Sequence, residues 1–214
     1  MSAFGWRRTG EVLEELASVW TLTPNPPDRF DAQDAEGNGR IVFRRPVCLP
    51  PILGTDSPES WLERLPDPPG RELIIVLQAG ASAVGVFDHE REDWLNRHVF
   101  RRYVIRGNGK AQPTHLKTKG KSRYGSRLRL QNAKKLADET VDWIEQALMQ
   151  EGPIDTVLRA AVDTTWFEFV RHCEVLEQLA DRTHRIPIDL GRPNLETLEQ
   201  ARWAAHRGEV LPTG

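Results

Sequence analysis

The 214-residue sequence is poor in cysteine and has no long apolar run. Cys48 and Cys173 are its two cysteines, far apart and without metal-ligand spacing, which favours two reduced thiols over a disulfide. No apolar stretch approaches the length that spans a membrane, and the N-terminus lacks the charged-then-apolar pattern of a signal peptide. We therefore expect a soluble protein of a reducing compartment, with a cytoplasmic location and no membrane partner.

The chain also lacks the motifs of several enzyme classes. It contains no Gly-x-Ser-x-Gly nucleophile elbow, no complete phosphate-binding P-loop and no reactive-cysteine context. Its six histidines show no ligand spacing. We therefore expect neither a metal site nor a cofactor.

Acidic residues are absent from one long segment, residues 101–135, which contains twelve Lys or Arg residues. The rest of the chain carries 17 basic and 31 acidic residues, although the net charge of the whole is only −2. A solvated surface usually mixes both signs, so this distribution is typical of an element that binds a polyanion. Because phosphates neutralised by Lys or Arg release counterions, the segment predicts contact with nucleic acid. Tyr103 and Tyr124 are candidates for base stacking, with packing inside a strand as the alternative for Tyr103.

The elements expected after residue 70 follow a regular order. Three hairpin-linked strands are predicted at residues 73–77, 83–87 and 97–106, followed by a long basic loop and a helix at 130–149. A strand at 154–162, a helix at 164–179, a strand at 185–190 and a helix at 194–206, capped by Asn194, complete the order. The helix at 164–179 is expected to turn Phe167 and Val170 toward the core. This order predicts an α/β fold with a mixed sheet, as in the ribonuclease H-like fold.

Residues 1–70 are interpreted as an N-terminal extension packed on the main domain, which comprises residues 71–214. The stretch 66–70 (PDPPG) marks the boundary. Only a helix at 11–20, a strand at 40–45 and a helix at 58–65 are expected in the extension.

A nuclease function is disfavoured by the first strand of the predicted sheet. A ribonuclease H-like nuclease holds two divalent ions with clustered carboxylates, one of which projects from that strand. The run from Leu73 to Leu77 contains no acid, and Asp155 and Asp163 flank the fourth strand without a partner there.

The passage GKSRYGSRLRLQNAKKLADETVDWIEQAL, residues 120–148, carries a family resemblance. It resembles the Vms-like release-factor domain, the peptidyl-tRNA-hydrolysing domain of ribosome quality control. That family is related to the central domain of eukaryotic and archaeal peptide-chain release factors. Its basic loop carries Gly-Ser-Gln or Gly-Gly-Gln before a helix that opens with Asn-Ala-Lys. Here the matching positions are Gly125-Ser126-Arg127 and Asn132-Ala133-Lys134, and the resemblance covers residues 73–206.

The resemblance implies a ribonuclease H-like fold that acts at the peptidyl-transferase centre of the large ribosomal subunit, on the ester between a nascent peptide and tRNA. The implied catalytic residues are Gly125, Ser126, Arg127 and Gln131. The residues implied to bind RNA are Lys110, Lys117, Lys119, Lys121, Arg123, Tyr124, Arg129 and Lys134.

Arg127 stands where the family has glutamine, and a guanidinium donates hydrogen bonds but accepts none. Gln131, one helical turn further on, is the candidate to position water instead. Three functions therefore remain open from the sequence: a peptidyl-tRNA hydrolase, a non-catalytic ribosome- or RNA-binding factor, and an adaptor that binds a protein partner through residues 1–70.

Overall fold

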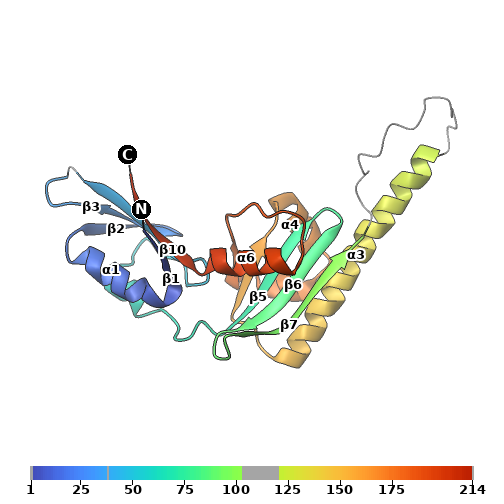
Figure 1. Cartoon of the computed structure of the whole chain (residues 1–214), viewed down its shortest axis with the longest axis horizontal. Helices are drawn as coiled ribbons and strands as arrows, with labels where there is room; N and C mark the ends of the chain where they lie inside the picture. The colour runs from blue at the N-terminus through green and yellow to red at the C-terminus, as the bar shows by residue number, and fades with distance from the viewer. Residues whose placement is uncertain (1, 38, 103–120, 214) are drawn as a thin grey trace.

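The computed structural model describes residues 2–37, 39–102 and 121–213, and for residues 121–126 and 129 the backbone alone. The basic loop expected after the third strand falls on residues 103–120 and lies outside the described residues. The chain forms a mixed α/β structure with two five-stranded sheets (Figure 1).

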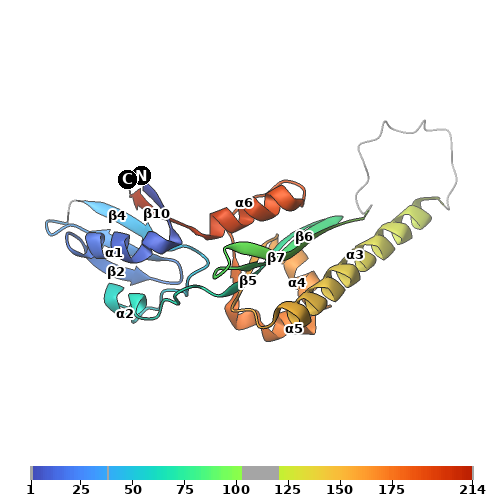
Figure 2. The same ribbon diagram turned by 60° about the horizontal axis from the view of Figure 1, so that its bottom comes forward.

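The first sheet is antiparallel and joins the two ends of the chain. Its order is β1 (Ser2–Gly5), β10 (Arg207–Pro212), β4 (Arg40–Arg44), β3 (Arg29–Gln33) and β2 (Thr21–Asn25). The C-terminal strand β10 thus lies between two strands of the first 44 residues (Figure 2). Residues 1–70 therefore share their sheet with the last strand of the chain.

Short helices cover the first sheet. They are η1 (Trp6–Arg8), α1 (Thr9–Ala17) and α2 (Pro58–Leu62), and the predicted positions of α1, α2 and β4 are confirmed. Ser57 caps α2 by accepting a hydrogen bond from the Ser60 backbone N–H, and Pro58 follows where no N–H is needed. The expectation of a single strand in residues 1–70 is wrong, because β1, β2 and β3 also form there. Pro24 is tolerated in β2 because β2 is an edge strand.

The second sheet is mixed. Its order is β7 (Asp93–Arg101), β6 (Ala81–Asp88), β5 (Arg71–Gln78), β8 (Thr156–Ala160) and β9 (Thr183–Arg185). The first three strands are antiparallel, and β8 and β9 run parallel to β5. The three hairpin-linked strands and the mixed sheet are as predicted, except that the third strand begins at Asp93 instead of residue 97 and ends at Arg101. Gly80, with a φ of +85°, supplies the left-handed residue of the β5–β6 turn.

Helices cover both faces of the second sheet. On one face lie α3 (Lys121–Glu151), α4 (Asp163–Val170) and α5 (Glu174–Gln178), and on the other lie α6 (Leu195–Ala205) and the first sheet (Figures 1 and 2). Strand β5 is buried on both faces: Ile74 and Val76 pack with α6 and the first sheet, and Leu73 and Ile75 pack with α3. The core that contains Ile74 also contains Phe43 of β4, so the two sheets share one hydrophobic core.

Two predictions for the C-terminal third need correction. The helix expected at 164–179 is broken into α4 and α5, followed by a 3₁₀ turn, η2 (Ala180–Arg182). Its core contacts come from Trp166 and Phe169, whereas Phe167 is exposed. The strand expected at 185–190 is the short β9.

The capped final helix is confirmed. The Asn194 side chain accepts a hydrogen bond from the Thr197 backbone N–H at 2.8 Å, and the Thr197 hydroxyl accepts one from the Asn194 N–H at 2.8 Å. In the described part of the chain, no helix is both long enough and apolar enough to cross a membrane.

Candidate functional site

Helix α3 is longer than the sequence predicted. It begins at Lys121 instead of residue 130 and continues to Glu151, which gives 31 residues and a length of about 46 Å. Gly125, Ser126 and Arg127 therefore lie in the helix, and their expected place in an irregular loop is wrong for this structure. The glycine-rich composition that suggested a loop was outweighed by the helix-forming residues that follow it.

The C-terminal half of α3 is firmly attached to the second sheet. Val141, Ile144 and Ala147 are buried in the core against β5 and β6. The hydroxyls of Ser82 and Thr140 lie 2.7 Å apart in a buried hydrogen bond, and the Thr140 hydroxyl also donates to the Leu136 carbonyl. This half of the helix is thus a rigid base for what precedes it.

The N-terminal half of α3 projects beyond the sheet (Figures 1 and 2). From Arg127 to Lys135, no side chain that the structure describes is buried. Leu130 is 74% exposed, and Leu128 is exposed as well. The described side chains of this half are thus exposed to solvent, apolar ones included.

The projecting half of α3 is basic. Arg127, Lys134 and Lys135 are exposed, and the first acidic residue of the helix is Asp138. The first turn carries no acid, so the partial positive charge of the helix N-terminus adds to that of the side chains. The projecting end is therefore suited to a polyanion.

The structure describes the predicted site residues to different extents. Arg127, Gln131 and Lys134 are described and exposed, and their spacing puts them on one stripe of α3. For Gly125, Ser126, Lys121, Arg123, Tyr124 and Arg129 the structure gives the helical backbone alone. Lys110, Lys117 and Lys119 lie outside the described residues, as does Tyr103.

A buried polar cluster between the two sheets escaped the sequence reading. Glu72, at the start of β5, is fully buried, and its Oε2 lies 2.7 Å from Nε2 of His206. Its Oε1 lies 3.0 Å from Nε2 of His89. The thiol of Cys48 is buried beside them. The available signal was alternation: Glu72 is in phase with Ile74 and Val76, which face this core.

The electrostatics of the cluster favour an ionised carboxylate. Burial acts to raise the pKa of Glu72, but hydrogen bonds from His206 and His89 outweigh it and hold that pKa below its ordinary value. For the Cys48 thiol, burial and then the Glu72 charge raise the pKa well above its ordinary value. Glu72 is thus a buried carboxylate stabilised by contacts with two imidazoles, beside a neutral thiol.

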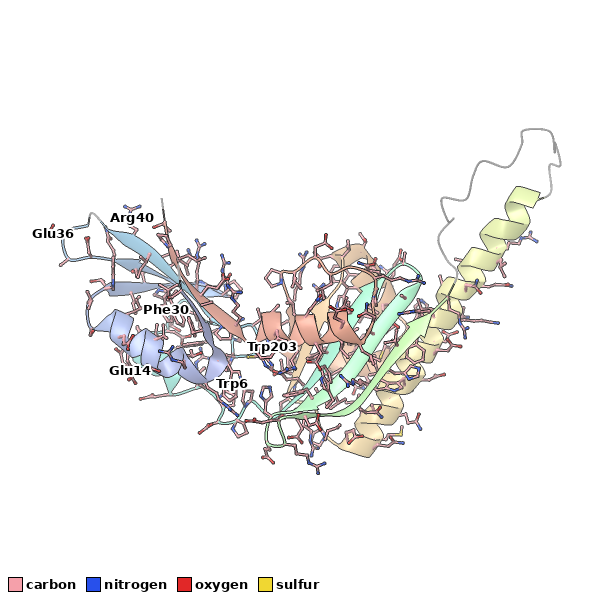
Figure 3. All side chains as sticks on the ribbon, in the orientation of Figure 1. Trp6, Glu14, Phe30, Glu36, Arg40 and Trp203 are labelled. Carbon is pink, nitrogen blue, oxygen red and sulfur yellow. The ribbon has the colours of Figure 1, made fainter. Side chains whose placement is uncertain are left out.

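A cleft of about 1160 Å³ lies at the junction of the sheets, next to this cluster. Its lining includes His89 and His206, and Trp6 and Trp203 flank it from the first sheet and from α6 (Figure 3). The guanidinium of Arg202 lies over the rings of Phe87 and Trp203. The cluster is therefore close to an accessible surface although its own atoms are buried.

Comparisons with known proteins agree with this two-sheet architecture. The solved structure of the "Vms1 mitochondrial localization core" is similar with a TM-score of 0.53 and 12% identity, over 97% of this chain and 82% of that chain. At that identity the likeness shows the fold, and it includes the first sheet. No curated protein sequence matches the chain. The model of a family described as "Bacteroidetes VLRF1 release factor" matches residues 72–210, which include all of α3. The chain therefore belongs to the Bacteroidetes VLRF1 release-factor family.

Proposed function

We propose that the chain is a ribosome-associated, release-factor-like protein that binds peptidyl-tRNA and hydrolyses its ester to free stalled nascent chains. The observation that carries the proposal is the projecting basic end of α3, which bears Gly125-Ser126-Arg127 in a member of a release-factor family. We also assign the second sheet to the ribonuclease H-like fold, because its order has three antiparallel strands followed by two parallel ones.

The reaction would be attack of water on the ester carbonyl, with the peptide leaving as a carboxylic acid and the ribose hydroxyl regaining a proton. Arg127 has five N–H donors and no acceptor, so it stabilises the negative charge that develops on the carbonyl oxygen or binds phosphate. Gln131 lies one turn further along the same stripe, and its amide oxygen accepts a hydrogen bond from the attacking water.

Gly125 gives the main chain room to approach the ester. In an intact helix, the N–H groups of residues 125–127 are paired with carbonyls four residues earlier. Use of one of these N–H groups for the oxyanion therefore requires the first turns of α3 to unwind on the ribosome. The missing side chain of Gly125 lowers the cost of unwinding, since glycine favours a helix less than alanine by about 1 kcal/mol.

Release of labelled peptide from stalled ribosome–peptidyl-tRNA complexes tests the proposal. We expect release by the wild-type chain and a loss of at least about 100-fold in rate for Arg127→Ala, the usual scale for removal of one oxyanion donor. Arg171→Ala is the matched control, because Arg171 is also exposed but lies at the end of α4. Equal release rates for wild type and Arg127→Ala would remove Arg127 from the mechanism.

A non-catalytic ribosome- or RNA-binding factor is the second candidate. The observation that favours it is Arg127 itself, which cannot position water as the family's glutamine does. This candidate predicts that the wild-type chain sediments with ribosomes in a salt-sensitive manner but releases no peptide. Release that appears only in Arg127→Gln would then identify a binding factor whose chemistry was lost at this position.

A further inference from the structure

Three metal-binding side chains converge in the buried cluster between the sheets. Cys48 Sγ, a carboxylate oxygen of Glu72 and a ring nitrogen of His206 all lie within 4.8 Å of one another, and all three residues are buried. We propose that Cys48, Glu72 and His206 bind one Zn²⁺ ion. Thiolate, imidazole and carboxylate are the donors that zinc takes in proteins, and this proposal is independent of the function assigned to α3.

The spacing of the donors is close to that of a zinc site. Zinc bond lengths and tetrahedral angles place pairs of ligand atoms about 3.4–3.6 Å apart. The Glu72–His206 pair, at 2.7 Å, shares a proton in a hydrogen bond, and a metal ion in place of that proton would part the two atoms by about 0.7 Å. The remaining pairs are within 4.8 Å of one another, so they would close by at most about 1.2 Å. Rotamer adjustments supply such shifts without moving the backbone.

The backbone around the three ligands is already fixed by hydrogen bonds. The Cys48 N–H donates to the Ala205 carbonyl at 3.1 Å, which ties the cysteine to the residue before His206. The His206 carbonyl in turn accepts from the Trp6 N–H at 2.9 Å. Glu72 is held in the register of β5 with β6 and β8. Ligands from three distant parts of the sequence are thus preorganised at one point.

A second observation concerns the contact between Glu72 and His89. The Oε1 of Glu72 and the Nε2 of His89 lie 3.0 Å apart, yet the contact is not a well-aligned hydrogen bond in the described part of the structure. Both side chains are buried, and a poorly aligned contact stabilises them less than a well-aligned hydrogen bond would. Metal binding would turn the carboxylate and allow His89 to hold its second oxygen, as outer-shell partners of zinc ligands commonly do.

The surroundings suit a bound metal and leave a route to it. Trp6 and Phe87 contact the His89 ring edge-on, with centroids 5.4 and 5.3 Å away, and form an apolar wall. His206 lines the cleft at the junction of the sheets, so an ion or a water molecule reaches the cluster from there. Three protein ligands leave the fourth zinc position for water or for a molecule in the cleft. Sequence spacing does not reveal such a site because its ligands are residues 48, 72 and 206.

The test measures metal in the full-length wild-type chain, by elemental analysis after growth with added zinc and by titration of the chelator-treated protein with Co²⁺. We expect about one zinc per chain and, with Co²⁺, a thiolate-to-cobalt charge-transfer band. Cys173→Ser is the matched control, because Cys173 is also buried but lies in the other core. This variant must keep the band, whereas Cys48→Ser should weaken metal affinity at least about 100-fold.

The experiment decides the proposal even if Cys48→Ser does not fold. A band that persists in Cys173→Ser identifies Cys48 as the ligand, since it is then the only thiol in the chain. A wild-type chain that takes up neither zinc nor cobalt would show a hydrogen-bonded polar cluster only and overturn the proposal. Metal bound without a thiolate band would overturn it equally.

Discussion

At the scale of single residues, the most consequential side chain in the core is Glu72. A carboxylate with no exposed surface is tolerated only with partners, and here His206 and His89 supply them. On the other side of the second sheet, Arg127 and Gln131 stand exposed on one stripe of α3 and face no described partner. Glu72 is therefore a charged group that depends on partners within the fold, whereas Arg127 and Gln131 make no contact that the described fold depends on.

Replacement of Glu72 by Gln tests whether the fold depends on the buried carboxylate. We expect a loss of about 3 kcal/mol in the free energy of unfolding near neutral pH, since a buried carboxylate that contacts His206 and His89 is removed. Because the native pKa of Glu72 is lowered, its ionised form stabilises the fold at pH values above its ordinary pKa of 4.5. That contribution is lost as the pH falls through the native pKa. The difference between wild type and Glu72→Gln should therefore shrink in acid. Urea unfolding at several pH values measures it, and a difference that does not change with pH would contradict the assignment.

At the scale of elements, α3 combines two roles along one helix. Its C-terminal half is core, with Ile144 fully buried, and its N-terminal half is solvent-exposed, with Leu130 74% exposed. Helix propensity alone stabilises an isolated helix only marginally, so the projecting turns rely on the anchored ones. This division explains how the N-terminal half of α3 is held away from the body of the protein.

Truncation of one side chain in each half of α3 tests this division between an anchored half and a projecting half. Ile144→Ala should cost about 2–5 kcal/mol in the free energy of unfolding, because it opens a cavity in the core. Leu130→Ala should change that free energy by less than about 0.5 kcal/mol. Denaturant unfolding of both variants provides the comparison, and a large cost for Leu130→Ala would show that the projecting half packs on the domain.

The charge of the projecting half predicts the salt dependence of ribosome binding. Lys134→Glu should weaken binding and reduce the slope of log affinity against log salt by about 1, since one phosphate contact is lost. Arg171→Glu is the control, with an exposed arginine on α4 instead of α3. Sedimentation with ribosomes over a series of salt concentrations gives both slopes. Equal slopes for the two variants would mean that binding does not use this face of α3.

Several elements were predictable from sequence because their signals are local. The Asn194 cap, the apolar run of β5 and the β5–β6 turn at Gly80 each depend on neighbouring residues, and the structure has them. The start of α3 at Lys121 was not predicted, since glycine and serine at 125 and 126 argue locally for a loop. The pairing of β10 with β1 and β4 was missed because it joins residues 165–208 positions apart, which no local pattern reports.

The polar cluster of the candidate site was missed for a similar reason. Glu72 lies just before the apolar run that begins at Leu73, and His89 and His206 look like isolated histidines in the sequence. The pairing of β5 with β6 and the packing of α6 on both strands bring the three together. By contrast, Gly125-Ser126-Arg127 could be predicted as a site from sequence because a family motif is a local signal.

At the scale of the whole molecule, the two sheets behave as parts of one body. They share a core that includes Phe43, Ile74 and Leu198, and strand β10 returns from the end of α6 into the first sheet. The division of the chain at residue 70 stays a prediction, and so does a protein partner for residues 1–70. What the arrangement provides is a broad base from which α3 projects.

Removal of β10 tests the unity of this body. A chain that ends at His206 loses the strand that pairs with both β1 and β4, and with it the backbone hydrogen bonds on two edges. We expect faster amide hydrogen exchange in β1 and β4. Because the two sheets share a core, we also expect β5 to lose its protection from exchange at a lower denaturant concentration. Unchanged protection of β5 would show that the sheets unfold independently.

The most direct measurement of the central claim is single-turnover peptide release from stalled ribosome–peptidyl-tRNA complexes, with the full-length protein in excess. The account predicts release by the wild-type chain and a loss of at least about 100-fold in rate for Gly125→Ala, with ribosome binding retained in both. Failure of the wild-type chain to release peptide, while it sediments with the same complexes, would contradict hydrolysis and leave a ribosome-binding factor.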